Sequence, residues 1–324
     1  MKAVITDYQY ENVETERKLI TETGAELVDC HCRTEDEVID ATHDADAVVV
    51  QYCNATENVI RHLEHCKLII KYGIGVDNID VRAATKKKIF VANVPDYGVE
   101  EVSNHTMAFL LALARKLPQM TQGLKDGVWG YSGAVPANRL SLCTLGLIGF
   151  GRIPQQVCNK AQAFGMRVLA YDPYQKEEAV HGAGAEQVDF DTLLKESDYI
   201  SCHCPLTAQT RHCVDAAAIE KMKPTACLIN TARGGIICES DLIDALKRKQ
   251  IAGAALDVYE KEPLPADSEL LNLPNVIATA HSAWYTEEAI QTLQRKVAEE
   301  VVRVLQGLPP LNPINRELLT GSHS

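Results

Sequence analysis

The chain has 324 residues, a hydrophobic content of 46% and a formal net charge of −12 at pH 7. This length and composition predict a globular protein of two domains, each large enough to bury its own core. The excess of acidic residues argues against a nucleic-acid partner, because binding to phosphate backbones depends mainly on Lys and Arg. No uncharged apolar run approaches the roughly 18 residues that span a bilayer, so we expect no membrane partner.

Eleven cysteines, in a chain whose start lacks the apolar stretch of a signal peptide, predict free thiols in a reducing compartment, the cytoplasm. Two Cys-His-Cys motifs, at 30–32 and 202–204, resemble metal ligands. If each motif lies in a strand, its two sulfurs share one face and its imidazole points to the other. Three convergent ligands are then not expected, and we predict no metal at either motif.

The first third of the chain alternates short β-branched runs with longer mixed segments. Strands that are separated by helix-length connections predict a parallel sheet. An amphipathic pattern then predicts a long helix over residues 99–117, and we place the end of the first domain at residue 98. The strands expected in this part are 2–6, 44–51, 66–73 and 89–93.

Residues 118–139 have Gly, Pro and Asn punctuation and no clear period, which predicts a long loop that is functional or docks on a neighbour. Six more apolar runs with helical stretches between them predict a second, doubly wound parallel sheet. A final helix is expected over residues 287–305. The six runs are 142–150, 166–172, 198–204, 226–230, 252–258 and 275–280. The fold class is therefore α/β with two doubly wound parallel-sheet domains.

A Gly-x-Gly turn at Gly149 and Gly151 lies between one of these strands and a helix that begins near Arg152. Such a turn lets a dinucleotide pyrophosphate approach the helix N-terminus. Asp172 follows the next strand, 23 residues after Gly149, where a carboxylate accepts hydrogen bonds from a ribose diol and repels a 2′-phosphate. The sequence therefore predicts NAD rather than NADP, although Pro154 replaces the third glycine and is expected to shift the phosphate turn.

Three polar residues stand in small or apolar surroundings downstream of this turn: Arg233, Glu262 and His281. The last two follow neighbouring strands of the predicted sheet, so they are expected to meet at its carboxyl edge. A carboxylate there stabilises the protonated imidazole, which makes His281 an acid in reduction and a base in oxidation. The guanidinium of Arg233 suits the carboxylate and carbonyl oxygens of a 2-oxo acid.

With these residues in place, the chain resembles the D-isomer-specific 2-hydroxyacid dehydrogenases over nearly its whole length. The resemblance rests on YGIGVDNID, VPDYGVEEV, GFGRI, YDP, HCPLT, NTARGG, ALDVYEKEP and the final histidine. HSAWYTEEA is most similar to the C-terminal binding protein branch, and phosphoglycerate dehydrogenase-like relatives also look similar. The resemblance implies a flavodoxin-like substrate domain made of residues 1–98 and 284–320, an inserted Rossmann cofactor domain at 99–283, and a homodimer formed through the long helix and the loop after it.

The resemblance also implies roles for individual residues. Arg233, Glu262 and His281 are the expected catalytic residues, and Asp257 is expected at the nicotinamide amide. Trp284, if it faces the substrate, favours an apolar 2-oxo acid. The residues expected to bind the cofactor are Ile74, Gly149, Gly151, Arg152, Ile153, Asp172, Cys204, Pro205, Thr231, Ala232, Asp257 and His281. The residues expected to bind substrate are Gly73, Ile74, Gly75, Arg233 and Trp284.

The leading interpretation is an NAD-dependent oxidoreductase that interconverts a small 2-oxo acid and a D-2-hydroxy acid by hydride transfer. Two alternatives stay open. One is D-3-phosphoglycerate dehydrogenase. Gln51 and Tyr52 count against it, because they are uncharged at positions where that enzyme usually has extra cations, whereas Lys71, just before the Gly-x-Gly loop at 73–75, favours it. The other is an NAD(H)-sensing scaffold like the corepressor branch, in which the cofactor promotes assembly.

Overall fold

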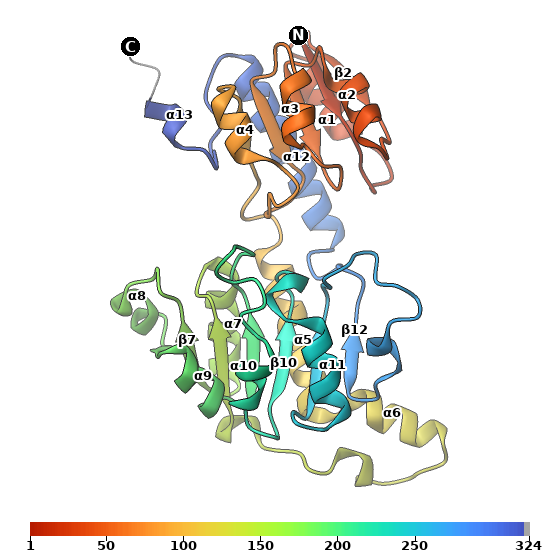
Figure 1. Ribbon diagram of the computed structural model, residues 1–324, viewed down its shortest axis with the longest axis vertical. Helices are drawn as coiled ribbons and strands as arrows, with labels where there is room; N and C mark the ends of the chain where they lie inside the picture. Colours follow the sequence, from red (N-terminus) through yellow and green to blue (C-terminus); the bar gives the residue numbers. More distant parts are fainter. Residues whose placement is uncertain (321–324) are drawn as a thin grey trace. The chain divides into compact units, whose positions relative to one another are not determined.

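The structure is a computed structural model that describes residues 1–320. The chain divides into two compact units: unit 1 contains Met1–Gly98 together with Tyr285–Ser324, and unit 2 contains Val99–Trp284. Unit 1 therefore combines the two ends of the chain, which are red to orange and blue in Figure 1, and unit 2 is the continuous segment between them.

Unit 1 is built around a five-stranded sheet of order β2-β1-β3-β4-β5, in which all neighbouring strands are parallel. This is the flavodoxin-like order, and it confirms the class of sheet predicted for this part. The strands are β1 (Lys2–Ile5), β2 (Glu26–Asp29), β3 (Ala47–Val50), β4 (Leu68–Lys71) and β5 (Phe90–Ala92). The helices are α1 (Glu14–Thr21), α2 (Glu35–Thr42), α3 (Glu57–His62), α4 (Val81–Lys86), α12 (Glu287–Leu305) and α13 (Glu317–Thr320).

Helix α12 completes the core of unit 1 from the far end of the chain. It begins after Thr286, whose side chain accepts a hydrogen bond from the Ala289 amide and so caps the helix. Leu293, Val297 and Val301 are fully buried in one cluster with residues of β1, β3 and β4. Because these residues recur every four positions, they form one apolar stripe against the sheet.

Unit 2 contains a seven-stranded parallel sheet of order β12-β11-β10-β9-β6-β7-β8. Its strands are β6 (Thr144–Ile148), β7 (Arg167–Tyr171), β8 (Glu186–Gln187), β9 (Tyr199–Cys202), β10 (Cys227–Asn230), β11 (Gly253–Leu256) and β12 (Val276–Ala278). Its α-helices are α5 (Val99–Arg115), α6 (Leu117–Lys125), α7 (Arg152–Ala163), α8 (Glu177–Gly182), α9 (Phe190–Glu196), α10 (Ala216–Glu220) and α11 (Glu239–Lys247). Short 3-10 turns are η1 (Ser132–Ala134), η2 (Leu140–Leu142), η3 (Gly234–Ile236) and η4 (Glu269–Asn272).

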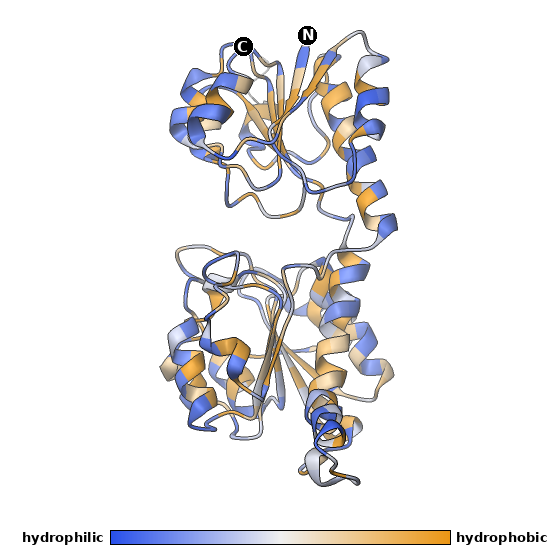
Figure 2. Ribbon diagram, turned by 90° about the vertical axis from the view of Figure 1, so that its right-hand side faces the viewer, coloured by the Kyte–Doolittle hydropathy of each residue, from blue (hydrophilic) through white to orange (hydrophobic). Residues whose placement is uncertain are grey.

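Two apolar clusters cover the faces of this second sheet, one with α5 and α7 and the other with α9, α10 and α11. Figure 2 shows hydrophobic residues concentrated in the strands of both units, with hydrophilic residues on the outer helix faces. The order of the strands reverses between β6 and β9, so the loops that follow these two strands diverge. Ligands of open α/β sheets bind at such a point, outside the carboxyl ends of the strands.

Several local predictions were wrong. The prediction of a loop over residues 118–139 missed α6, because Pro118 lies in the first turn, where a helix tolerates proline. The short strands β2 and β8 were not predicted. The Cys-His-Cys motif at 30–32 follows β2 instead of lying in a strand, so the alternation argument fails there.

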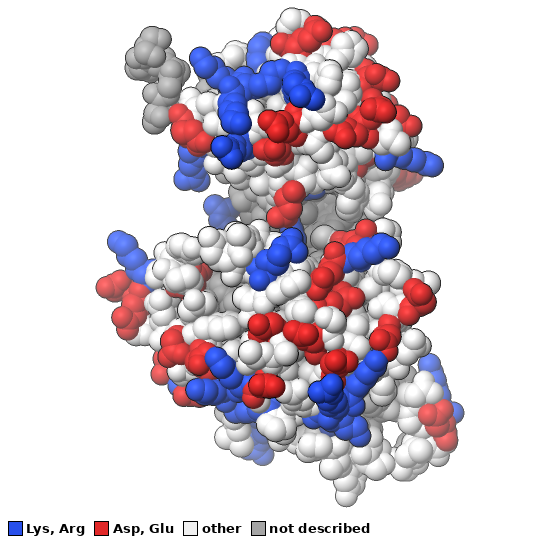
Figure 3. All heavy atoms as spheres, viewed as in Figure 1, with Lys and Arg blue, Asp and Glu red and all other residues white. Residues whose placement is uncertain are grey.

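Charged side chains of both signs are interspersed over the face seen in Figure 3. None of the helices at residues 1–320 combines the length and apolar character needed to cross a membrane.

Candidate active site

The Gly-x-Gly turn lies after β6, at the point where the strand order reverses. Gly149 has a positive φ of 93°, and a Cβ there would lie 2.8 Å from the Cys204 backbone nitrogen, so only glycine fits. Gly151 is the N-cap of α7 and faces open space. The first-turn amides of α7 have no intrahelical acceptor, which leaves them available to an anion. The buried Pro154 takes the third helical position, where its missing amide hydrogen costs no helix hydrogen bond.

Asp172 follows β7 and ties the glycine turn to that strand. Its Oδ2 accepts a hydrogen bond from the Phe150 amide at 2.8 Å, and its Oδ1 accepts one from the Tyr174 amide at 2.9 Å. Each carboxylate oxygen has a second lone pair, so the group can still accept from a ribose hydroxyl. An open glycine turn, a helix N-terminus and this carboxylate together fit a dinucleotide.

The second Cys-His-Cys motif begins at the end of β9, and its two cysteines pack on the same apolar cluster while its histidine points elsewhere, as predicted. Cys202 is buried in the apolar cluster on one sheet face, while the His203 ring contacts the Ser201 hydroxyl at 2.9 Å. Burial lowers the pKa of His203 to about 3, so this ring is neutral. A hydrogen bond to Cys213, together with burial, raises the pKa of the Cys204 thiol, which therefore stays protonated at neutral pH.

Asp257 follows β11 and fixes the loop that carries His281. The residue is only 1% exposed. Its Oδ1 accepts from the Ser282 amide at 2.9 Å and the Thr279 hydroxyl at 2.5 Å, and its Oδ2 accepts from the Ala283 amide at 2.9 Å. Its backbone carbonyl accepts from the His281 amide at 2.7 Å. These bonds hold His281 at a φ of 51°, a conformation that non-glycine residues rarely adopt and that is concentrated at functional sites.

Glu262 and His281 contact each other, as their places on neighbouring strands predict. His281 Nδ1 lies 2.6 Å from Glu262 Oε2, and both side chains are about one third exposed, at 35% and 33%. The Tyr259 amide donates to Glu262 Oε1 at 3.0 Å and so orients the carboxylate. Burial acts to raise the pKa of Glu262, but the hydrogen bond and charge of His281, with help from Arg233, hold that pKa below its usual value.

This lowered pKa predicts how stability depends on pH. A carboxyl whose folded pKa is depressed stabilises the fold above its unfolded value, here 4.5, and this contribution is lost as pH falls through the folded pKa. We expect Glu262→Gln to destabilise the protein at pH 7 and to match the unaltered chain at the lowest pH at which both fold. Urea unfolding of both proteins across this pH range measures the difference. A difference in the free energy of unfolding that does not change with pH would contradict the assignment.

Arg233 follows β10 and begins the turn η3. Asn230, the last residue of the buried strand, donates from Nδ2 to the Arg233 carbonyl at 2.9 Å and accepts from the Ala232 amide at 3.0 Å. The next residue, Gly234, packs so closely on the backbone of Tyr259 that a Cβ would lie 1.9 Å from its carbonyl carbon. This close approach places the loop of Arg233 against the loop that leads to Glu262.

The remaining predicted site residues of unit 2 lie on the same loops. Thr231 is buried and its hydroxyl lies 2.9 Å from that of Thr106 on α5. The Trp284 indole is half-buried and donates to the His281 carbonyl at 3.0 Å. Ile153 is half-buried, whereas Arg152 and Pro205 are exposed.

In unit 1, the loop of Gly73, Ile74 and Gly75 follows β4. Asn93 donates from Nδ2 to the Ile74 carbonyl at 2.6 Å, which fixes the middle of this loop. Lys71, at the end of β4, directs its ammonium to the Gln51 carbonyl and to Asn78 Oδ1. A cation is therefore held at the carboxyl edge of this sheet, next to the glycine loop.

The sequence interpretation missed the residues that position the predicted ones. Asn230 orients the turn of Arg233, and Thr279 links Asp257 to His105 of α5 through contacts of 2.5 Å and 3.2 Å. The role of Asp257 as an anchor of the histidine loop was also missed. A polar residue at the end of an apolar strand was the available signal for Asn230 and Asp257.

Two doubly wound sheets, a glycine turn where the strand order reverses, and an acid-imidazole pair near an arginine define a dinucleotide-binding α/β protein. Residues 107–283 match the profile described as D-isomer specific 2-hydroxyacid dehydrogenase, NAD binding domain. The chain belongs to this family.

Curated relatives and solved structures agree with this membership. The chain is 43% identical over 317 residues to D-3-phosphoglycerate dehydrogenase of Methanocaldococcus jannaschii, covering 97% of this chain and 59% of the relative. It is 38% identical to glyoxylate reductase of Thermococcus litoralis, covering 88% of each. The structure of D-lactate dehydrogenase from Aquifex aeolicus complexed with NAD and lactic acid has a TM-score of 0.85 at 30% identity and 98% coverage of both chains. The chain covers only 52% and 54% of the length of two other phosphoglycerate dehydrogenases that it matches.

Proposed function

We propose that this chain catalyses the NAD-dependent interconversion of a small 2-oxo acid and the corresponding D-2-hydroxy acid. The observation that carries the proposal is the 2.6 Å contact between His281 Nδ1 and Glu262 Oε2, with Arg233 on the adjacent loop after β10. When bound, the nicotinamide supplies or accepts a hydride. The residues proposed to hold it are those of the glycine turn, Asp172 and the loops after β9, β10 and β11.

The proposed roles follow from the geometry of the three side chains. Because Glu262 engages Nδ1, Nε2 is the nitrogen of His281 that can give a proton to a carbonyl oxygen or take one from a hydroxyl. The carboxylate keeps the imidazole oriented and stabilises its protonated form. The Arg233 guanidinium is proposed to bind the substrate carboxylate and to polarise the carbonyl.

In unit 1, we propose that the backbone amides of Gly73, Ile74 and Gly75 bind the substrate carboxylate. The bond from Asn93 to the Ile74 carbonyl supports this role, because a loop fixed in advance loses less freedom when it binds an anion. For Trp284 we propose a wall of the substrate site that favours apolar side chains.

The direct test is a screen of NADH oxidation over glyoxylate, hydroxypyruvate, pyruvate, branched 2-oxo acids, phenylpyruvate and phosphohydroxypyruvate. Rapid turnover of an unphosphorylated 2-oxo acid supports the proposal. Negligible turnover of the whole panel, with assembly that depends on NADH, would overturn it in favour of a dinucleotide-sensing scaffold.

The second candidate activity is D-3-phosphoglycerate dehydrogenation. Two observations favour it: the 43% identity to an archaeal enzyme of that name, and the ammonium of Lys71 beside the glycine loop. Preference for phosphohydroxypyruvate in the same screen selects this candidate, and a loss of that preference in Lys71→Met would assign it to the ammonium.

Asp172 provides the prediction about cofactor choice. Asp172→Asn keeps an oxygen that can accept hydrogen bonds but removes the charge that opposes a 2′-phosphate. We expect the ratio of kcat/KM for NADH to that for NADPH to fall about tenfold, equivalent to about 1.4 kcal/mol. Glu196→Gln, which removes a distant exposed carboxylate, is the control. Equal kcat/KM with both cofactors in the unaltered protein would refute the NAD assignment.

We also propose a homodimer that uses α6 and the segment after it. This region exposes several large apolar side chains, among them Trp129, which is 90% exposed, and Leu142, which is 81% exposed. Such a concentration of apolar surface is typical of an interface.

We further propose the cytoplasm as the location, because free cysteines fit a reducing compartment.

The dimer proposal predicts the effect of a surface substitution. Trp129→Ser is expected to weaken self-association at least tenfold, because aromatic side chains often dominate binding energy at interfaces. Sedimentation velocity over a concentration series measures the change. Tyr174→Ser is the matched control, since Tyr174 is 88% exposed but lies outside the segment. Equal association of both variants would place the interface elsewhere.

A further inference from the structure

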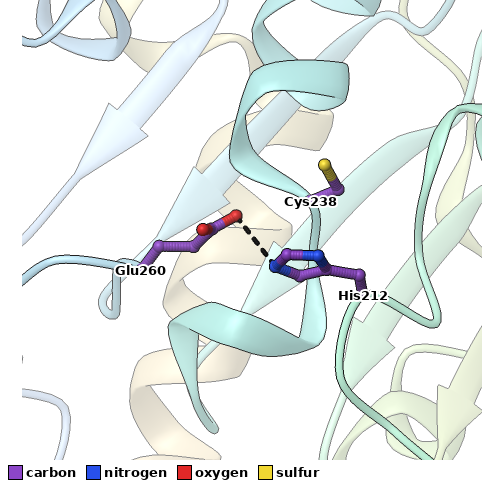
Figure 4. A group of neighbouring side chains, drawn as sticks. All are labelled: His212, Cys238 and Glu260. Atoms are coloured by element: carbon purple, nitrogen blue, oxygen red, sulfur yellow. Dashed lines mark ion pairs between the residues drawn. The ribbon is translucent and has the colours of Figure 1, made fainter.

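A group of three possible metal ligands lies in unit 2: His212, Cys238 and Glu260. A ring nitrogen of the histidine, Sγ of the cysteine and a carboxylate oxygen of the glutamate all lie within 4.8 Å of one another. It is the one such group of three found over residues 1–320. Figure 4 shows the Glu260 carboxylate directed at the imidazole, with Cys238 beside the ring. Neither Cys-His-Cys motif contributes a residue to the group.

The backbone brings these three residues together from separate segments. Residues 212–214 run beside residues 235–238, because the His212 amide donates to the Gly235 carbonyl at 2.8 Å and the Cys238 amide donates to the Val214 carbonyl at 3.0 Å. Glu260 is held at the start of α11 by a reciprocal pair of bonds. The Glu239 amide donates to Glu260 Oε1 at 2.7 Å, and the Glu260 amide donates to Glu239 Oε2 at 3.2 Å.

The His212 ring has a nitrogen without a hydrogen bond. Nε2 is buried and makes no hydrogen bond within the described part of the chain, although it lies 3.2 Å from Glu260 Oε1. Two atoms bound to one zinc ion at about 2.0–2.2 Å in tetrahedral geometry are about 3.3–3.6 Å apart, close to this separation. The nitrogen lone pair then points at the ion and away from the oxygen. Zinc therefore accounts for a close approach that no hydrogen bond accompanies.

We propose that His212, Cys238 and Glu260 bind a zinc ion. An imidazole, a thiolate and a carboxylate are the three ligand types that zinc takes in proteins, and the thiolate disfavours Mg²⁺ and Ca²⁺. The thiol of Cys238 loses its proton on binding. The Ser240 hydroxyl, 3.4 Å from Sγ, is placed to donate to the thiolate. A water molecule would complete the tetrahedron.

The site has a consequence for the neighbouring loops. It joins the turn that precedes Val214, the start of α11 and the loop after β11, and Glu260 lies two residues before Glu262. The ion would thus brace the loop that carries Glu262. Unlike the proposed reaction, this role requires no substrate or dinucleotide.

The test is zinc binding by the full-length chain, stripped of metal, kept reduced and without cofactor. Zn²⁺ is titrated in competition with a chromophoric chelator, and Co²⁺ reports thiolate ligation through its charge-transfer absorption. We expect one high-affinity equivalent, an affinity at least tenfold lower in His212→Gln, Cys238→Ser and Glu260→Gln, and loss of the charge-transfer band in Cys238→Ser. Zinc should raise the thermal midpoint of the unaltered protein by more than that of these variants.

Two control variants separate this site from the other thiols and imidazoles. Cys213→Ser removes the thiol next to His212 in the chain, and His181→Gln removes an exposed histidine 3.8 Å from Glu177. Both should bind zinc like the unaltered protein. Equal losses in the controls, or the absence of a high-affinity equivalent in the unaltered protein, would overturn the proposal. Circular dichroism verifies that each variant is folded, and because the readout is metal affinity, the result is independent of the dehydrogenase proposal.

Discussion

His281→Asn is expected to lower kcat for 2-oxo acid reduction by about 10³-fold, because it removes the group proposed to move the proton. His281 has a φ of 51°, and asparagine tolerates this left-handed backbone better than most residues. Asparagine therefore removes the imidazole with little disturbance of the backbone. The bond from the residue 281 amide to the Asp257 carbonyl is then retained. Steady-state kinetics give kcat, and NADH fluorescence gives the cofactor affinity.

Two results would show whether the loss of activity in His281→Asn comes from the missing proton donor or from disruption of its loop. NADH affinity should change less than threefold in His281→Asn, since the loop is held by Asp257 and not by the imidazole. Glu262→Gln should lose less activity than His281→Asn, because it weakens the orientation of the imidazole without removing it. Turnover by His281→Asn within tenfold of the unaltered protein would contradict the assignment of the proton donor.

Arg233→Lys is expected to lower kcat/KM by about 100-fold, and Arg233→Gln by about 10³-fold, as is typical when a donor to a developing charge is lost. Lysine retains the charge but lacks the planar pair of donors that matches a carboxylate. Kinetics with the best substrate of the panel measure both effects. Arg248→Lys is the control, because its 3.8 Å ion pair with Asp244 is exposed.

The pH profile of the Arg233→Gln variant provides an independent check. The charge of Arg233 is one of the influences that lower the pKa of Glu262. Without that charge the carboxyl binds its proton at higher pH, so the acidic limb of the activity profile should move to higher pH. A limb that moves to lower pH, or a Lys variant as active as the unaltered protein, would contradict the proposed role.

The sequence predicted the strongly apolar strands well and the weak ones poorly. β3 and β4 are short buried runs rich in Val and Ile, which is typical of the central strands of a parallel sheet. β2 is an edge strand in which two of the four residues, Glu26 and Asp29, are acidic, and charges of this kind are common on edges that must not pair further. β8 has only two residues. α6 has Leu117, Met120 and Leu124 at helical spacing, but Pro118 and Gly123 interrupt this short segment and favoured the prediction of a loop.

In the candidate site, the contacts that follow from the order of the strands were predictable, and those that depend on the path of a loop were not. Glu262 and His281 follow adjacent parallel strands, so topology alone predicts that they are near each other. The hydrogen bonds from Ser282 and Ala283 to Asp257 depend on how the chain turns after β12. The left-handed backbone of His281 arises from that turn, and no residue type in the segment predicts it. The group of His212, Cys238 and Glu260 depends in the same way on pairing between loops.

The place of α12 bears on the order in which the chain folds during synthesis. Residues 99–284 are contiguous and hold a complete apolar core, so this part can fold as soon as it leaves the ribosome. The five-stranded sheet emerges earlier, but residues that complete the cover of one of its faces, including Leu293 and Val297, are made about two hundred positions later. The first sheet to be translated is therefore the last to be finished, because until α12 is made only α1 and the residues next to it cover part of that apolar face.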